Sequence, residues 1–272
     1  MKCDAINSGP TNFNGSLGHY KVIKTKDQSH TLFSEAFNEA CHSLDGAWEE
    51  TSFNYLEGCG IPEKSEKLGE KALSVLEVGF GLGVGLQVVC DFYEKSGPEK
   101  SFFFTSLEID KGLIDWTLKN WHSSLPPLKG SFHTAQELDY FKGTCGRGEI
   151  LILIGDARET LKKASKKKMI PKLDAIFQDP FSPKRNPSLW TVEWFEELKK
   201  ISSPEVMLST YSSSTSVRKS LEAAGWFMKN APGFSSKRTS TRAFLEGPSD
   251  PDVIDKLKRA PIKPLRDEEI ET

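Results

Sequence analysis

Short apolar runs alternate with amphipathic segments from residue 72 to residue 224 of the chain. Each apolar run is typical of a buried strand, and each segment between the runs has helical spacing. The predicted strands are residues 72–78, 102–108, 150–154, 173–178 and 206–211. The predicted helices are residues 84–93, 111–121, 157–168 and 214–224. This alternation predicts an α/β fold, a mostly parallel sheet with helices on both faces. Residues 226–230 and 240–245 predict an antiparallel edge.

The N-terminal residues follow a different pattern. Residues 19–23 alternate between polar and apolar like a strand, and residues 29–34 form a second short candidate. Between them, Lys26-Asp27-Gln28 is typical of a hairpin turn. Residues 37–47 have a helical, aromatic-rich pattern. We therefore expect a small β-rich accessory layer on the main domain.

These patterns divide the chain into three parts. Residues 1–70 form the accessory segment, and residues 71–247 form the domain that holds the parallel sheet. Residues 248–272 are rich in proline and charge, which predicts a polar surface tail or a partly disordered one.

Composition narrows the class of protein. A length of 272 residues allows one large domain or two small ones, and a hydrophobic share of 37% allows a sizeable core. No apolar run approaches the roughly 20 residues that cross a bilayer, and residues 1–10 lack the plan of a signal peptide. The net charge of −2 provides no global basic field, so a nucleic-acid partner would need a local patch. Scattered cysteines without metal spacing predict a reduced cytoplasmic compartment and no metal site: Cys3, Cys41, Cys59, Cys90 and Cys145.

A glycine-rich turn, Glu77-Val78-Gly79-Phe80-Gly81-Leu82-Gly83, separates the first strand from the first helix. Dinucleotide-binding turns need a further glycine where this chain has Val84 or Leu86. The turn instead resembles the acid-x-Gly-x-Gly-x-Gly pattern of S-adenosylmethionine-dependent methyltransferases. The resemblance implies that Glu77, Gly79, Gly81 and Gly83 bind this cofactor.

Two further acids follow predicted strands. Glu108 ends the second strand, where an acid accepts hydrogen bonds from both ribose hydroxyls. Asp156, followed by Ala157, ends the third, where this class of enzyme holds the adenine amino group. A carboxylate suits both tasks because it only accepts hydrogen bonds. A single acid at a strand end is more often a helix cap or turn residue, but three acids in order favour a cofactor site.

The fourth strand leads into the loop 179–191, which begins Asp179-Pro180-Phe181-Ser182-Pro183. Three prolines fix φ along this loop, so it holds its side chains still. The alternative is an ordinary strand-terminal turn. In methyl transfer to nitrogen, an acceptor such as Asp179 directs the amine lone pair, and a ring such as Phe181 packs beside it. Orientation would then provide most of the rate gain.

With these motifs taken together, the chain resembles the methyltransferase half of the MnmC-type tRNA modification enzymes. The better-known bifunctional members read Asp-Gly-Phe-Ala-Pro where this chain reads Asp179-Pro180-Phe181-Ser182-Pro183. The acid, the aromatic ring and the final proline are retained. The resemblance runs from about residue 31 to 245 and rests on Glu49-Glu50-Thr51, the glycine turn, Glu108, Gly155-Asp156 and residues 174–183, 186–191, 217–226 and 233–238.

The resemblance implies a Rossmann-like class I methyltransferase that acts in the cytoplasm. Its activity would be methyl transfer from S-adenosylmethionine to the primary amine of 5-aminomethyl-(2-thio)uridine, at the wobble position of the tRNA anticodon. The bifunctional members also carry an FAD-dependent oxidase half. The chain ends too soon to contain that half, so we expect no FAD, no metal and no obligatory protein partner.

The proton of the substrate amine limits what Asp179 can do. An alkylamine has a pKa near 10.4 and an unperturbed aspartate about 3.9. Proton transfer between them would cost about 9 kcal/mol. We therefore expect the proton to leave to water while Asp179 orients the neutral amine.

RNA contacts are predicted on two basic loops beside the site, with Lys184 and Arg185 on one and Lys237 and Arg238 on the other. The alternative for each is an ordinary solvated side chain. Reading an unstacked uridine needs an aromatic platform, for which the candidates are Phe181, Trp190, Tyr211 and Phe234. Core packing is the alternative for each ring except Phe181. His30 and His42 lack metal-like partners and are expected to be structural or lid residues.

Two other functions fit parts of the pattern. An aminopropyltransferase-like enzyme would use decarboxylated S-adenosylmethionine, but its polyamine pocket would need more carboxylates around Asp179. A non-catalytic RNA module would bind the cofactor without transferring a methyl group. Retention of Asp179-Pro180-Phe181 argues against this second alternative.

Overall fold

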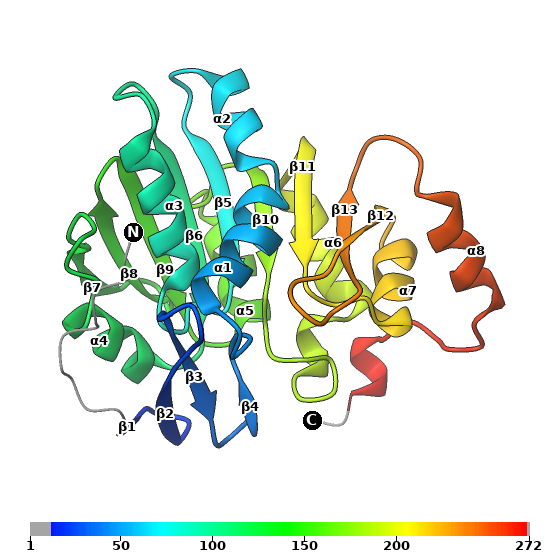
Figure 1. Cartoon of the computed structure of the whole chain (residues 1–272), viewed down its shortest axis with the longest axis horizontal. Coiled ribbons are helices and arrows are strands. Elements are labelled where there is room, and N and C mark those ends of the chain that lie inside the picture. The colour runs from blue at the N-terminus through cyan, green and yellow to red at the C-terminus, as the bar shows by residue number, and fades with distance from the viewer. Residues whose placement is uncertain (1–11, 271–272) are drawn as a thin grey trace.

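The computed structural model describes residues 12–270, and its centre is a nine-stranded sheet (Figure 1). The predictions about residues 1–10 and Cys3 lie outside these residues. The order of the strands confirms the predicted α/β fold with an antiparallel edge. In space the strands follow the order β12 (Phe227–Pro232), β13 (Thr239–Phe244), β11 (Ser202–Thr210), β10 (Leu173–Gln178), β5 (Leu73–Val78), β6 (Phe102–Glu108), β9 (Gly148–Ile154), β8 (Asp139–Cys145) and β7 (Lys129–Thr134).

Five neighbouring strands, β11, β10, β5, β6 and β9, are parallel. Helices cover both faces of this part, which is why its strands are continuous apolar runs; all six residues of β5 are buried. Strand β10 returns to the opposite side of β5 from β6 and β9. The strand order therefore reverses beside β5, and such a reversal opens a crevice at the carboxyl ends of the strands.

The helices form two layers around the sheet. Figure 1 shows α3 (Val84–Lys95) and α4 (Lys111–Lys119) in front of the sheet, and α5 (Ala157–Lys166) and α6 (Val192–Ile201) behind it. Helix α7 (Thr215–Ala223) follows β11. The four predicted helices are present, whereas α6 was missed. Its start is capped by the Thr191 side chain, which accepts a hydrogen bond from the Trp194 N–H.

The sheet has a second antiparallel edge that the sequence pattern did not reveal. Strands β7 and β8 form a hairpin against β9. Strand β7 is exposed at five of its six residues, so it lacks the apolar alternation that marks a strand. Strand β8 buries Phe141 and Cys145 and attaches the hairpin to the core.

The N-terminal residues form a separate four-stranded antiparallel sheet: β1 (Asn12–Asn14), β2 (His19–Lys24), β3 (His30–Ser34) and β4 (Glu39–Ala40). The two predicted strands and the turn between them are confirmed. The helix predicted over 37–47 is wrong, because Glu39–Ala40 pair with β3 and Asn38 has a φ of 49°. Contacts of Phe37 and Glu39 with the loop after β10 override the helical pattern.

Three short helical segments connect the two sheets. They are α1 (Ala47–Thr51), the π-helical turn η1 (Ser52–Glu57) and α2 (Ile61–Leu68). In Figure 1 the small sheet lies below the carboxyl ends of the parallel strands. The accessory layer therefore covers the end of the main sheet where a ligand crevice is expected.

The C-terminal segment is more regular than the tail predicted for it. Residues Pro251–Arg259 form α8, which buries Val253 and Leu257 one turn apart. Beyond α8, the Leu265 N–H donates to Ser220 Oγ, and Arg266 pairs with Glu193 over 3.0 Å. Two apolar positions among many charges gave too weak a helical signal. Two 3₁₀ turns complete the elements, η2 (Pro187–Leu189) and η3 (Asp267–Glu269).

Within residues 12–270, no helix has the length and apolar character that a membrane crossing requires.

Candidate active site

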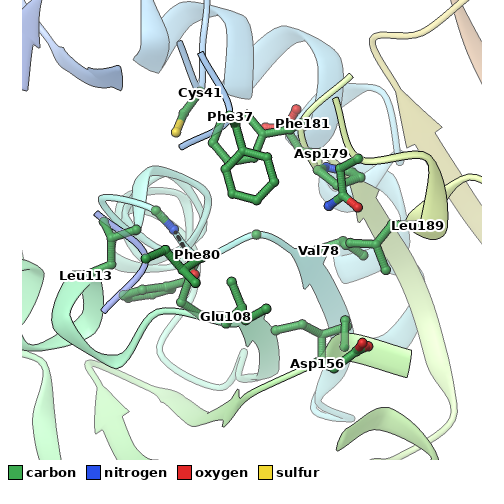
Figure 2. A pocket seen from close by; sticks show the side chains of 18 of the residues that line it. Phe37, Cys41, Val78, Phe80, Glu108, Leu113, Asp156, Asp179, Phe181 and Leu189 are labelled. Carbon is green, nitrogen blue, oxygen red and sulfur yellow. Dashed lines mark hydrogen bonds between the residues drawn. The ribbon is translucent and has the colours of Figure 1, made fainter. Parts of the chain in front are cut away.

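A cavity lies where the carboxyl ends of β5, β6, β9 and β10 face the N-terminal sheet (Figure 2). The main sheet contributes the turn after β5, the ends of β6 and β9, and the loop after β10. From the N-terminal residues, the lining includes Leu17, Tyr20, Phe37, Cys41 and His42. Figure 2 shows Phe37, Phe181 and Asp179 on one side of the cavity and Glu108 and Asp156 on the other.

The glycine turn approaches the cavity with its backbone. Gly79, Gly81 and Gly83 have φ values of 96°, 52° and 67°, a region that favours glycine. A Cβ on Gly79 would lie 3.4 Å from the Asp179 carbonyl oxygen, and one on Gly83 would press against the Phe80 ring at 2.9 Å. Gly79 and Gly81 line the cavity, whereas Gly83 caps the start of α3.

Glu77 lies beneath this turn rather than in the cavity wall. Its buried carboxylate accepts a hydrogen bond from Ser106 Oγ over 2.8 Å. A Cβ on Gly85 would come within 1.9 Å of Glu77 Oε1, so the start of α3 packs directly on this carboxylate. Burial raises the pKa of Glu77 well above its usual value. The position suits a residue that supports the turn, and direct contact of Glu77 with a cofactor stays a prediction.

Glu108 lines the cavity and also holds the glycine turn. Its Oε2 accepts the Gly81 N–H and its Oε1 accepts the Asp110 N–H, both over 3.0 Å. Burial raises the pKa of Glu108 above its usual value. Each oxygen retains a further lone pair, so two hydroxyl donors from a ribose fit this carboxylate.

Asp156 and Ala157 lie in the cavity wall after β9. The Asp156 side chain caps α5 by accepting the Arg158 N–H over 2.8 Å, and it also pairs with the Arg158 guanidinium. Asp156 is therefore both the helix cap that its position after a strand suggested and a residue of the cavity wall. Contact of Asp156 with an adenine amino group stays a prediction.

Asp179 is nearly buried, with 15% of its side chain exposed. Its Oδ1 accepts a hydrogen bond from the Tyr55 hydroxyl, and its Oδ2 lies 3.8 Å from His42 Nε2. Burial, followed by the charge of Glu50, raises the pKa of Asp179 well above its usual value. Asp179 is therefore a stronger proton acceptor than an unperturbed aspartate.

The loop after Asp179 is held on both sides. The Phe181 ring stacks on Phe37, and Ser182 donates to Glu39 Oε2 from its N–H (3.1 Å) and its hydroxyl (2.8 Å). On the other side, Trp190 Nε1 donates to the Phe181 carbonyl over 2.9 Å. Trp190 is fully buried, so it packs in the core and offers no face to a base.

The four predicted RNA contacts differ in their surroundings. Lys184, Arg185 and Arg238 are exposed. Lys237 pairs with the buried Glu50 over 3.2 Å, and its ammonium lies 4.6 Å from the centre of the Tyr211 ring. The Tyr211 hydroxyl donates to the Pro180 carbonyl over 3.0 Å. Both Tyr211 and Lys237 therefore lie beside the Asp179 loop.

Several residues of the site were not predicted: Glu39, Cys41, Glu50 and Tyr55, together with a place for His42 beside Asp179. Glu50 belongs to the matched stretch Glu49-Glu50-Thr51, but that match carried no role for it. The remaining side chains come from the small sheet and the π-helical turn. Their approach to Asp179 depends on long-range packing that no local pattern encodes.

A family of S-adenosyl-L-methionine-dependent methyltransferases matches residues 121–246 of the chain. The bifunctional protein MnmC of tRNA 5-methylaminomethyl-2-thiouridine biosynthesis from Pseudomonas aeruginosa PAO1 is 28% identical over 233 residues, which are 82% of this chain and 35% of that protein. The protein of the same name from Aromatoleum aromaticum is 30% identical over 228 residues, which are 78% of this chain and 33% of that protein. The chain thus spans about a third of the length of these relatives.

Among solved structures, MnmC2 from Aquifex aeolicus is similar to almost the whole chain. The TM-score is 0.73 with 27% sequence identity, and the match covers 96% of this chain and 83% of the Aquifex chain. The chain is therefore similar to the S-adenosyl-L-methionine-dependent methyltransferases and to the MnmC proteins.

Proposed function

We propose that the chain transfers a methyl group from S-adenosylmethionine to the primary amine of 5-aminomethyl-(2-thio)uridine, at the wobble position of tRNA. The observation that carries this proposal is that one cavity holds both groups of residues, with Asp179 and Phe181 opposite Glu108 and Asp156 (Figure 2). The relatives named for tRNA 5-methylaminomethyl-2-thiouridine biosynthesis support the choice of substrate. A tRNA substrate also supports a cytoplasmic place of action.

The cofactor would lie along the main-sheet side of the cavity. Glu108 would accept the ribose hydroxyls, Asp156 and Ala157 would hold the adenine, and Gly79 and Gly81 would lie along the methionine end. The lining supports this fit because it provides acceptor carboxylates and a backbone that no Cβ covers. When bound, S-adenosylmethionine supplies a methyl group on an electrophilic sulfonium. This chemistry needs no metal and no flavin, so the proposal includes neither.

The amine would lie against Asp179 and Phe181. Asp179 accepts hydrogen bonds from the amine N–H groups, which leaves the nitrogen lone pair directed at the methyl group. The raised pKa of Asp179 narrows the gap to the amine, so the cost of moving a proton falls below the value for an unperturbed aspartate. Asp179 remains an orienting acceptor in this mechanism, and water remains the final destination of the proton.

RNA would approach over the loops that surround the cavity. Lys184, Arg185 and Arg238 are exposed and free to reach phosphates near the anticodon. Lys237 would contact phosphate only after leaving Glu50, so we place it second to the other three. Phe181 and Tyr211 border the place where an unstacked uridine would enter, and Phe234 lies on the same loop as Lys237. No protein partner is required.

In this proposal, residues 71–247 form the methyltransferase domain and residues 1–70 an accessory segment. Phe37 and His42 of that segment line the cavity, which supports a direct part for it in the site. Residues 248–272 have no assigned role in the reaction.

One observation favours the aminopropyltransferase alternative more than the sequence did. Glu39 and Glu50 lie near Asp179, which gives the site the carboxylates that a polyamine pocket requires. However, Glu50 is paired with Lys237, and Glu39 is bonded to Ser182. Because both carboxylates already have partners, methyl transfer remains the better supported reaction.

A labelled-methyl assay tests the proposal. The full chain is incubated with labelled S-adenosylmethionine and tRNA from cells that lack the methylamino modification. We expect label in this tRNA and none in tRNA that is already methylated. Calorimetric titration with S-adenosylmethionine and its decarboxylated form separates the aminopropyltransferase alternative, because the latter compound should bind more weakly. Cofactor binding without label transfer would favour the non-catalytic RNA module.

A further inference from the structure

The carboxylate of Asp179 has one candidate donor at each oxygen, and both donors come from the N-terminal residues. The Tyr55 hydroxyl donates to Oδ1, and His42 Nε2 lies 3.8 Å from Oδ2. Tyr55 belongs to η1, and His42 follows β4. Neither residue takes part in the mechanism described above.

Tyr55 is fixed in place. Its side chain is 1% exposed, and its ring packs against Phe177 with centroids 5.4 Å apart. Burial and the charge of Asp179 raise the pKa of Tyr55 well above its usual value, so the hydroxyl keeps its proton. A buried hydroxyl that keeps its proton and cannot turn to water is a permanent donor to Asp179.

The hydrogen bonds of Thr31 hold His42 in place. Thr31 Oγ1 accepts the His42 N–H over 3.0 Å and lies 3.2 Å from His42 Nδ1. This hydroxyl can donate to Nδ1 or accept from it, and the Asp179 carboxylate opposite Nε2 favours the tautomer that carries its proton on Nε2. Burial lowers the pKa of His42, so the ring is neutral. A neutral ring that accepts at Nδ1 carries its proton on Nε2, the atom that faces Asp179.

The other groups around Asp179 mostly oppose its charge. Burial and the acids Glu50, Glu39 and Glu77 favour the protonated carboxyl, whereas Lys237 favours the anion. Tyr211 and Cys41 also face this carboxyl. A protonated Asp179 would donate a hydrogen bond to the amine lone pair, and that lone pair would no longer be free to attack the methyl group. The site therefore needs donors that keep Asp179 an anion.

We propose that Tyr55 and His42 are positioning residues for methyl transfer, which hold Asp179 as a carboxylate with a fixed orientation. The Tyr55 hydroxyl takes one lone pair of Oδ1, the His42 Nε2–H faces Oδ2 from 3.8 Å, and the remaining lone pairs accept the amine N–H groups. The nitrogen lone pair then forms the new N–C bond while the S–C bond breaks and its electron pair stays on sulfur. The product ammonium loses its extra proton to water, and Asp179 keeps its charge throughout. This inference rests on the proposed function.

Activity against pH provides the first test. Single-turnover methyl transfer to aminomethyl-uridine tRNA is measured for the wild type, Tyr55→Phe, His42→Leu and His42→Gln. Loss of the donor in Tyr55→Phe or His42→Leu should move the acid limb to higher pH. At the pH values of that limb, Tyr55→Phe should lower the rate about tenfold, which is the effect expected from the loss of one hydrogen bond to a charged group. His42→Gln keeps an N–H donor near the same place and should restore most of the rate lost in His42→Leu.

Tyr140→Phe is the matched control, because Tyr140 stacks on His133 of the β7–β8 hairpin, away from the cavity. Its profile should equal that of the wild type. Unfolding temperature and S-adenosylmethionine affinity are measured for each variant. A folded Tyr55→Phe variant with the wild-type acid limb would overturn the inference. If Tyr55→Phe does not fold, equal pH profiles of activity for His42→Leu and the wild type would overturn the inference.

A direct titration separates this inference from the proposed function. The pKa of the Asp179 carboxyl is followed by carbon NMR in the wild type and in Tyr55→Phe, with S-adenosylmethionine bound and without RNA. We expect a higher pKa in the variant, and an equal pKa would overturn the inference whatever the substrate is. Failure of the wild type to methylate aminomethyl-uridine tRNA would instead overturn the proposed function.

Discussion

Phe37 and Phe181 lie face to face, with ring centroids 4.2 Å apart and ring planes inclined by 15°. Phe37 comes from the N-terminal residues and Phe181 from the loop after β10, and both line the cavity. Phe37 thereby fixes the ring that the proposed mechanism places beside the amine. The N-terminal segment is thus part of the site and not only an addition to the main domain.

We expect Phe37→Ala to lower kcat/KM for the tRNA, because the Phe181 loop loses its support. The ring pair contributes about 1 kcal/mol in addition to the burial of the half-buried Phe37 ring, so the unfolding temperature should also fall. Steady-state kinetics and thermal unfolding measure both effects. Phe227→Ala is the control, because Phe227 is exposed on the edge strand β12 and should leave the kinetics unchanged. Equal kinetics for Phe37→Ala and the wild type would contradict a role for this stack.

Glu77 should make stability depend on pH. Its pKa is raised in the folded protein, so the folded state binds the proton more tightly than the unfolded state does. The free energy of unfolding should therefore decrease as pH rises from about 4.3, the usual value for glutamate, towards the folded pKa. Glu77→Gln lacks this ionisation. Urea unfolding at several pH values should show a shallower decline for Glu77→Gln, and identical slopes would exclude the effect.

Glu108 should control cofactor affinity. Glu108→Gln removes one acceptor oxygen and weakens the hold on the Gly81 N–H, so S-adenosylmethionine should bind about 10- to 100-fold more weakly. Calorimetric titration measures this change. The exposed Glu246 provides a matched control, since Glu246→Gln should bind the cofactor like the wild type. Unchanged affinity in Glu108→Gln would place the ribose elsewhere.

Lys184 and Arg185 should act on RNA binding alone. Their replacement by glutamate should weaken tRNA binding and reduce its salt dependence, because fewer phosphate counterions are released. S-adenosylmethionine affinity should remain unchanged. Lys256 and Lys258 on α8 are also exposed, and the same replacement there should have little effect. Filter binding at several salt concentrations distinguishes the pairs, and equal losses for both pairs would point to a general charge effect.

The sequence predicted the parts of this structure that local patterns control. The strands around β5 are apolar on both faces, so their runs were recognisable. Glu108, Asp156 and Asp179 lie at or just after the carboxyl ends of their strands, so their convergence at one edge followed from the fold. The positions of Tyr55 and His42 beside Asp179 could not be predicted from local patterns. They reach Asp179 through a π-helical turn and a short edge strand, and both depend on contacts across more than a hundred residues.

The most direct test of the central claim is the mass of the modified nucleoside. Aminomethyl-uridine tRNA is incubated with S-adenosylmethionine and either the wild type or Asp179→Asn, and its nucleosides are analysed by mass spectrometry. We expect the wild type to add one methyl group to the aminomethyl nucleoside. Asp179→Asn should bind the cofactor normally but react at least about 100-fold more slowly, because the amine loses its orienting carboxylate. An unchanged nucleoside with the cofactor-bound wild type, or a wild-type rate in Asp179→Asn, would contradict the account.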